Sequence, residues 1–367
     1  MQKKSRIVFD PTTGMVMVAQ DLSTVQRAQP KPQGFWDWKS NNDWNQLGNL
    51  TFYASIIQNG LFITVSDSGI WYSTDGGQWM NQAAAPSTPT LYAITSGKRS
   101  TDGEEIFVAV GEEAGFFSLD GKTWIAAKGL GDAYLYDVIY ANNFFVAVGY
   151  DATILYSLDG DTWTAPPGIT GESQFNAVTY ANDVFVAVAD SSTIWYSSDG
   201  KDWTIATGLS GSANFADVVY GGGKFVAVAD YGTIWNSSDG KNWSISNTIP
   251  PDGPDIIFYK VCYGNGSFVA AGDMSGAVAP ATPIYYSKDG VTWSQAKGIK
   301  FDDDYNDWPP FNDLNYVNGY FVAVNKSSEL VFPMYSSTDG INWNENQAPS
   351  KPLGNGGNGN GGDNDDE

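Results

Sequence analysis

Short runs of hydrophobic residues, separated by Gly, Asn and Asp, make up most of the chain. In residues 215–246 the segments FADVVY, FVAVAD, TIWNSS and WSIS are separated by GGGK, YG and DGKN. The segments are rich in Val, Ile, Tyr, Phe and Trp and alternate in polarity, which is typical of β-strands. Gly, Asn and Asp favour turns, and no segment has a 3.6-residue apolar period. The pattern predicts four short strands in this stretch and no helix.

The motif S-x-D-G-x-x-W occurs seven times, once in each stretch of this kind. Its aspartates are Asp75, Asp120, Asp159, Asp199, Asp239, Asp289 and Asp339, with spacings of 45, 39, 40, 40, 50 and 50 residues. A period near 40 residues with four strands per period is typical of a β-propeller blade. The sequence therefore predicts an all-β fold, a single β-propeller of four-stranded blades.

The Asp-Gly step of each motif predicts a tight turn between the third and fourth strands of a blade. The Asp carboxylate and the Ser hydroxyl can both accept hydrogen bonds from backbone N–H groups of the same turn. The Trp begins the outer strand, where its ring can pack on a neighbouring turn. We therefore interpret the seven aspartates as structural residues.

This motif resembles the Asp-box, or BNR repeat, of a family of β-propellers. The resemblance covers residues 50–347, although the usual family pattern has one more residue between Asp and Trp. In that family the Asp-box is structural and lies away from the catalytic centre. The resemblance implies that the seven aspartates hold turns.

Residues at both ends fall outside the seven repeats, which gives three segments: an extension or degenerate blade (1–49), the propeller (50–349) and a tail (350–367). RIVFDPTTGMVMVAQ near the N-terminus predicts two strands around a turn. Seven blades with an N-terminal extension are therefore expected, and eight blades are the alternative. The tail, rich in Gly and Asn and acidic at its end, is expected to be disordered.

Candidate binding residues lie in long insertions near the sixth and seventh repeats. These are NTIPPDGPDI, GDMSGAVAPATP, GIKFDDDYNDWPPF and NKSSELVFP, all expected on the face opposite the motifs. One insertion carries Asp302, Asp303, Asp304, Tyr305, Asp307 and Trp308. Carboxylates beside aromatic rings suit a sugar, and closely spaced carboxylates suit Ca²⁺. The third interpretation is a solvated acidic loop, and no other cofactor or metal is expected.

An acidic residue also recurs where the second strand of each blade meets the third. The residues are Asp67, Glu112, Asp151, Asp190, Asp230 and Asp273, and the series ends at Asn325 and Lys326. They are expected to surround the central channel on the face opposite the motifs, where they could hold a cation or a basic partner. The alternative is the general preference of turns for Asp.

Composition excludes several classes of function. The net charge of −22 argues against nucleic-acid binding and favours cations or basic partners. The absence of His removes serine triads and most zinc sites. The single Cys262 allows no internal disulfide. No Sec signal peptide and no membrane insertion are expected, because no long apolar run is present.

Catalysis is considered because the Asp-box family includes sialidases and other glycoside hydrolases. A sialidase would imply an arginine triad drawn from separate blades, whereas this chain has only Arg6, Arg27 and Arg99. A glycosidase needs two carboxyl groups about 5–10 Å apart, and no pair here has a distinguishing motif. For these reasons we expect no enzyme activity. Photosystem assembly factors in the family generally carry an export signal, which is not expected here.

The remaining class is a non-enzymatic binding or structural module. An acidic, rigid repeat protein without an export signal is typical of a phage virion, since virion proteins are released by lysis. We predict a capsid or tail decoration or host-attachment protein that contacts virion proteins or a host-surface glycan. A bacterial surface adhesin that binds glycan is the alternative, and a glycoside hydrolase is a further one. The expected location is the virion or an extracellular surface.

Overall fold

The computed structural model describes strands and turns only. The described residues are 7–10, 15–18, 52–74, 80–81, 89–169, 171, 173–246, 255–275, 282–299, 311–317, 319–325 and 334–346. No helix occurs among them, and in particular none that is long and apolar enough to cross a membrane. The prediction of an all-β chain is confirmed for this part of the protein.

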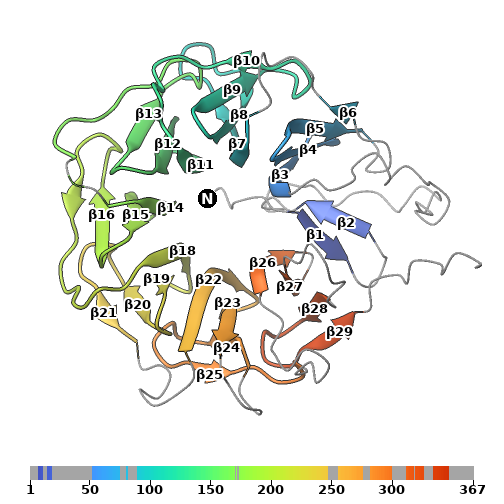
Figure 1. The fold of residues 1–367 in the computed structure, drawn as a ribbon, viewed down its shortest axis with the longest axis vertical. Coiled ribbons are helices and arrows are strands. Elements are labelled where there is room, and N and C mark those ends of the chain that lie inside the picture. Colours follow the sequence, from blue (N-terminus) through green and yellow to red (C-terminus); the bar gives the residue numbers. More distant parts are fainter. Residues whose placement is uncertain are drawn as a thin grey trace, which may run out of the picture.

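Seven antiparallel sheets are arranged around a ring as the blades of a propeller (Figure 1). The first strand of each blade lies nearest the centre: β3 (Phe52–Gln58), β7 (Leu91–Lys98), β11 (Leu135–Ala141), β14 (Phe175–Ala181), β18 (Phe215–Gly221), β22 (Asp255–Gly264) and β26 (Phe311–Val317). The second strands are β4 (Leu61–Ser66), β8 (Glu105–Gly111), β12 (Phe144–Gly149), β15 (Val184–Ala189), β19 (Lys224–Ala229), β23 (Ser267–Ser275) and β27 (Tyr320–Asn325).

The third and fourth strands complete each blade toward the rim. The third strands are β5 (Gly69–Ser73), β9 (Ala114–Ser118), β13 (Ile154–Ser157), β16 (Thr193–Ser197), β20 (Ile234–Ser237), β24 (Ile284–Ser287) and β28 (Met334–Ser337). The fourth strands are β6 (Met80–Asn81), β10 (Ile125–Ala126), β17 (Thr204–Ile205), β21 (Ser244–Ile245), β25 (Ser294–Gln295) and β29 (Asn344–Asn346). In the third blade a single bridge between Tyr156 and Thr164 takes the place of a fourth strand.

The second strands form the buried middle of the blades. All six residues of β15, VFVAVA, are buried, and so are all six of β12. Alternation was predicted for these strands and is wrong here, because both faces of a second strand are covered by the neighbouring blades. A strand buried on both faces has a nearly continuous hydrophobic sequence.

Two short strands precede the first blade. β1 (Ile7–Asp10) and β2 (Met15–Val18) form an antiparallel hairpin that lies next to β3 (Figure 1). The predicted pair of strands is confirmed. Within the described residues seven sheets form blades and this hairpin is a further sheet of two strands. Residues 19–51, which follow it, lie outside the described residues, so the alternative of an eighth blade stays a prediction. The predicted tail, residues 350–367, lies outside the described residues.

One insertion of the sixth blade differs from its prediction. GDMSGAVAPATP was expected to leave the sheet as a loop, but its first residues continue β23 as far as Ser275 and pair with the start of β22. Asp273 therefore lies opposite Ile257 within a β-ladder instead of in a turn. The alternating segment IIFYKV of the first strand provides partners for this longer hairpin.

Candidate functional site

The S-x-D-G-x-x-W motif forms a closed turn on one face of the ring, as the copy at residues 197–203 illustrates. Asp199 Oδ1 accepts hydrogen bonds from the backbone N–H groups of Lys201 (2.9 Å) and Asp202 (2.8 Å) and from the Ser197 hydroxyl (3.0 Å). Ser197 Oγ accepts the Gly200 N–H at 2.8 Å, and the Trp203 indole N–H donates to the Gly200 carbonyl at 3.0 Å. The same bonds recur around Asp120, Asp159, Asp239, Asp289 and Asp339, whereas Asp75 lies outside the described residues.

These hydrogen bonds lower the pKa of the six described motif carboxyl groups. For Asp199 and Asp289 the first cause is the backbone N–H three residues further on. For the others, burial acts most strongly and in the opposite direction, but the hydrogen bonds together outweigh it. The pKa of Asp239 and that of Asp339 fall to about 2. The motif carboxylates are thus ionised acceptors held by their own turns.

The motif glycine brings each turn against the preceding blade. Gly200 has a φ of 71°, and a Cβ at this position would overlap the ring of Phe144 in the blade before it. Gly240 faces Val184 and Val186 of its preceding blade in the same way. Each described motif therefore fixes a turn and also closes a contact between blades, which accounts for its repetition around the ring.

The opposite face carries a feature that the sequence analysis missed. Every first strand has a β-bulge near its start. The bulged residues are Tyr53, Tyr92, Tyr136, Asn176, Ala216, Tyr259 and Asn312. All seven are half-buried. A bulge re-aims a side chain out of the regular pleat. Aligning the repeats on the pairs FY, LY, LY, FN, FA, FY and FN would have indicated these positions.

Three of the bulged tyrosines form a cluster across the first three blades. The ring centroids of Tyr53 and Tyr92 are 5.0 Å apart, and those of Tyr92 and Tyr136 are 5.6 Å apart. The Tyr92 hydroxyl donates a hydrogen bond to Glu112. Burial, followed by this bond and the charge of Glu112, raises the pKa of Tyr92. Burial and nearby carboxylates, including Asp67, also raise the pKa of Tyr53.

The predicted series of acidic residues lies on this same face, with two differences. Asp67, Glu112, Asp190 and Asp230 directly follow the second strands of their blades. In the third blade Tyr150 occupies that place and Asp151 comes one residue later, while Asp273 belongs to β23. The charges of Glu112 and Asp190 both raise the pKa of Tyr136, after burial and Tyr150. The acidic residues therefore act on the tyrosine cluster.

We call this surface the acidic face, defined by the bulged residues together with Asp67, Glu112, Glu113, Asp151, Asp190, Asp230 and Asp273. The motif face, on the other side of the ring, carries the S-x-D-G-x-x-W turns and the hairpins between first and second strands. Ser100 of one such hairpin donates its backbone N–H to the carbonyl of Leu158 in a motif, at 2.9 Å. The loop at residues 96–105 therefore lies on the motif face.

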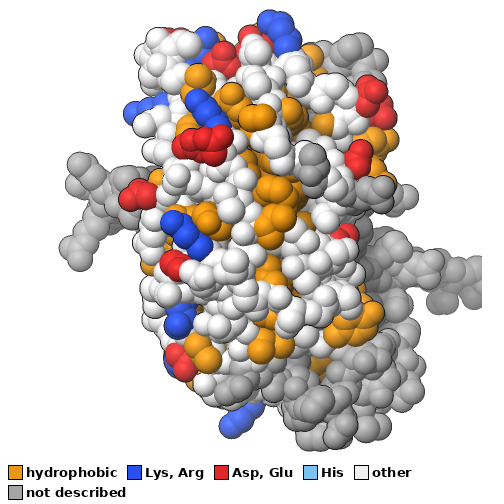
Figure 2. All heavy atoms as spheres, turned by 90° about the vertical axis from the view of Figure 1, so that its left-hand side faces the viewer, with side chains coloured by type: hydrophobic (Ala, Val, Ile, Leu, Met, Phe, Trp, Pro, Cys, Tyr) orange, Lys and Arg blue, Asp and Glu red, His pale blue; other side chains and the backbone are white. Residues whose placement is uncertain are grey.

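The described Lys and Arg side chains lie mainly on the motif face. Within the described residues the motif face carries Lys98, Arg99, Lys122, Lys201, Lys224, Lys241 and Lys288. Lys128 and Lys297 pair at the rim with the next blade, and Lys260 lies on a first strand. Figure 2 shows Lys and Arg side chains over the left and upper parts of its view, and acidic side chains without them along its right edge. Among the described residues, carboxylates therefore outnumber lysines on the acidic face.

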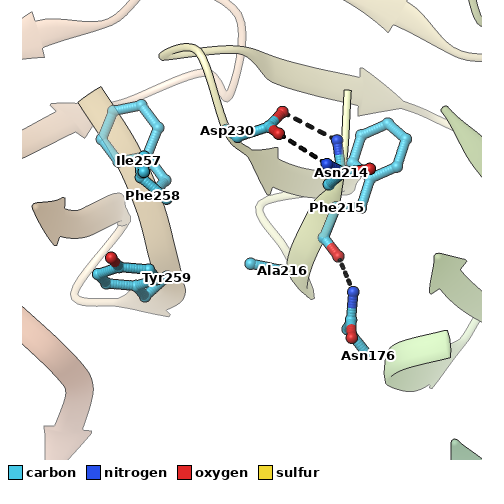
Figure 3. A pocket seen from close by; sticks show the side chains of 8 residues that line it. All are labelled: Asn176, Asn214, Phe215, Ala216, Asp230, Ile257, Phe258 and Tyr259. Atoms are coloured by element: carbon cyan, nitrogen blue, oxygen red, sulfur yellow. Dashed lines mark hydrogen bonds between the residues drawn. The ribbon is translucent and has the colours of Figure 1, made fainter. Parts of the chain in front are cut away.

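A pocket of about 370 Å³ opens on the acidic face between the fourth, fifth and sixth blades. Its lining includes Asn176, Ala216, Asp230 and Tyr259, with the apolar residues around them (Figure 3). Asp230 Oδ1 accepts the backbone N–H of Asn214 at 2.9 Å, and Oδ2 accepts the Asn214 side-chain amide at 2.9 Å. The pocket thus combines a fixed carboxylate with an aromatic wall.

The sugar or cation site predicted from the insertions cannot be placed on this surface. Asp302, Asp303, Asp304, Tyr305, Asp307 and Trp308 lie outside the described residues. Within the part of the chain that the structure describes, no group of three His, Cys, Asp or Glu side chains could hold a metal ion. Glycan and Ca²⁺ binding at residues 302–308 stay predictions.

Comparison with known proteins supports the propeller fold. No family model matches the sequence, and no curated protein matches it. A computationally designed propeller, Ika8, is similar with a TM-score of 0.55 and 13% identity, over 81% of this chain and 83% of that one. YCF48 from Cyanidioschyzon merolae has a TM-score of 0.49 and 14% identity, over 72% and 87%. A structure of YCF48 bound to D1 peptide has a TM-score of 0.46 and 17% identity, over 60% and 74%.

These results define the class of the protein. The chain is a β-propeller whose described residues form seven blades, and the likeness at these identities extends to the fold alone. Membership of the Asp-box family stays a prediction from the motif.

Proposed function

We propose that this propeller is a non-catalytic binding module that presents its acidic face to a basic surface of a partner protein. The separation of charge between the two faces is the observation that carries the proposal. A surface on which the described carboxylates outnumber the described lysines attracts a cationic partner and accelerates its association. Tyrosine is enriched at protein interfaces, because its ring supplies contact area and its hydroxyl a hydrogen bond.

The hydrogen bonds that the described carboxylates accept within the protein support the non-catalytic part of the proposal. The motif aspartates accept several hydrogen bonds from their own turns. Asp230 and Asp190 of the acidic face each accept a hydrogen bond from an asparagine amide. These bonds position the side chains as fixed acceptors, which suits recognition. Release of reducing ends from a bacterial surface polysaccharide by the purified protein would contradict this part.

An amidated octa-lysine peptide tests the acidic face. We expect binding at low ionic strength, and the triple variant Asp67→Asn, Glu113→Gln, Asp151→Asn should weaken it by about tenfold, as expected for removal of three charges from one surface. Fluorescence anisotropy with a labelled peptide measures the effect. The variant keeps the shapes of the side chains, and its melting temperature should remain close to that of the wild type.

The matched control removes three exposed charges from the motif face, with Glu104→Gln, Asp183→Asn and Asp202→Asn. Because the net charge changes equally, both triple variants should bind alike if only total charge matters. We expect the control to retain binding within about threefold. Equal weakening by both variants, or no binding by the wild type at low salt, would remove the basis for this function.

For the biological setting we propose a phage virion, with residues 1–49 attaching the propeller to the particle. The acidic composition and the rigid repeat support this setting, and the β1–β2 hairpin beside β3 is a candidate attachment element. Deletion of residues 1–44 should remove the protein from purified particles while octa-lysine binding and the melting curve are retained. Mass spectrometry of the particles measures this, and a truncated protein that still enters particles would contradict attachment through this segment.

A further inference from the structure

We infer that the pocket beside Ala216 receives an arginine side chain of the basic partner, an inference that rests on the proposed function. The pocket lies beside the smallest of the seven bulged residues. Ala216 occupies the bulge of β18, where four other blades have tyrosine and two have asparagine. Figure 3 shows open space between Ala216 and Tyr259, where a longer side chain at position 216 would lie.

The walls of the pocket suit a long cationic side chain. Tyr259 provides an aromatic face, and Ile257, which is 44% exposed, provides apolar surface for the aliphatic stem. Asp230 provides the negative charge at the rim. A carboxylate has about four acceptor positions, and Asn214 uses one on each oxygen of Asp230. The remaining positions can accept N–H groups of a ligand.

The surroundings of the pocket add to its negative potential. The charge of Asp273, acting after burial, raises the pKa of Tyr259. Asp190 accepts the side-chain amide of Asn176 at 2.9 Å, which keeps a second carboxylate beside the lining. None of the lining residues is cationic, and Lys260, the residue after Tyr259, is not part of the lining.

Arginine fits these walls better than lysine. Its planar guanidinium stacks on an aromatic ring and donates several hydrogen bonds in one plane, whereas an ammonium group is a compact, strongly hydrated charge. The volume of about 370 Å³ exceeds that of one side chain, so the backbone of the partner can enter with it. The partner segment is therefore expected to carry arginine flanked by small residues.

The test uses three labelled peptides of four repeats each: Gly-Arg, Gly-Lys and Gly-citrulline. Citrulline has nearly the shape of arginine but no charge. We expect the wild type to bind Gly-Arg about tenfold more tightly than Gly-citrulline and more tightly than Gly-Lys, since the cation and its stacking both contribute. Anisotropy at moderate ionic strength reduces the contribution of general charge attraction.

Ala216→Tyr fills the pocket with the residue that four other blades already place at this bulge. It should weaken Gly-Arg binding about tenfold, through loss of the contact with the pocket walls. The matched control Ala126→Tyr, on the exposed outer strand β10, should leave binding unchanged. Asp230→Asn keeps the pocket open and should remove the preference for Gly-Arg over Gly-citrulline, which gives a second measurement if Ala216→Tyr does not fold.

Three results would overturn the inference. In the first, Ala216→Tyr folds, and both it and Asp230→Asn bind Gly-Arg as the wild type does, whereas the triple variant of Asp67, Glu113 and Asp151 binds it more weakly. The pocket is then not the binding site, but the acidic face still is. If the wild type binds none of the cationic peptides, the pocket and the proposed function are both wrong. Equal affinity for Gly-Arg and Gly-citrulline would also exclude recognition of the guanidinium group.

Discussion

Gly200→Ala is expected to lower the free energy of unfolding by about 3 kcal/mol, as the sum of backbone strain and overpacking. Gly200 has a φ of 71°, where a side chain is unfavourable. A Cβ here would also overlap the ring of Phe144, which is 6% exposed and packs on Phe185 at a centroid distance of 5.2 Å. Because the contact joins two blades, the ring of the propeller must open locally to accept the methyl group. Urea unfolding followed by tryptophan fluorescence measures the change.

Gly266→Ala is the matched control for this prediction. Gly266 has nearly the same φ, 72°, but nothing lies within 4 Å of the position that a Cβ would take. It should therefore cost about 1 kcal/mol from backbone strain alone. Adding Phe144→Leu to Gly200→Ala should recover part of the loss, since it removes ring atoms from the overlap. Equal destabilisation by the two single glycine variants would show that the contact between blades contributes nothing.

Acid is expected to destabilise the propeller steeply between about pH 4 and pH 2. The pKa of each described motif carboxyl group is lowered in the folded protein. A lowered folded pKa contributes stability above the unfolded value near 3.8, and this contribution is lost as the pH falls through the folded pKa. For Asp239 and Asp339 that value is about 2. Allowing for solvent screening, each of these two contributes about 1 kcal/mol.

The double variant Asp239→Asn, Asp339→Asn tests this origin of the acid sensitivity. It should be less stable than the wild type at pH 7, and the difference should shrink as the pH falls from 4 to 2, because the wild-type carboxylates then become neutral too. Urea midpoints at pH 7, 4, 3 and 2.5 measure the trend. A difference that stays constant over this range would assign the acid sensitivity to other groups. Glu104→Gln with Asp202→Asn, both exposed on the motif face, is the matched control.

Local sequence was sufficient to predict the blades. The motif turn is built from residues within seven positions of one another, and its hydrogen bonds around Asp199 are all local. The strands of residues 215–246 also begin and end close to the predicted positions, since Gly, Asn and Asp mark their turns. Such short-range patterns define a supersecondary unit, and their repetition near 40 residues indicates a ring of such units.

Predictions that assumed an average blade were less accurate. Asp273 was assigned to a turn because its place in the repeat matches that of Asp230, but β22 and β23 extend past that place. The pairing of Ile256 with Met274 buries both side chains and supports the longer hairpin. The hydrophobic Met274 within GDMSGAVAPATP was the feature of the sequence that could have indicated the longer hairpin. The candidate residues 302–308 remain a prediction, because they lie outside the described residues.

The sequence by itself determined the strands, the motif turns, the seven repeats and the excess of negative charge, because each depends on neighbours in the chain or on composition. Only the tertiary structure decided where that charge and the tyrosines lie. Closing the ring brings Tyr53, Tyr92 and Tyr136 into contact from three blades. It also places Asn176 and Tyr259 on either side of the short Ala216 side chain. A pocket between blades depends on side chains about 40 residues apart, and ring closure is the interaction that sets their distance.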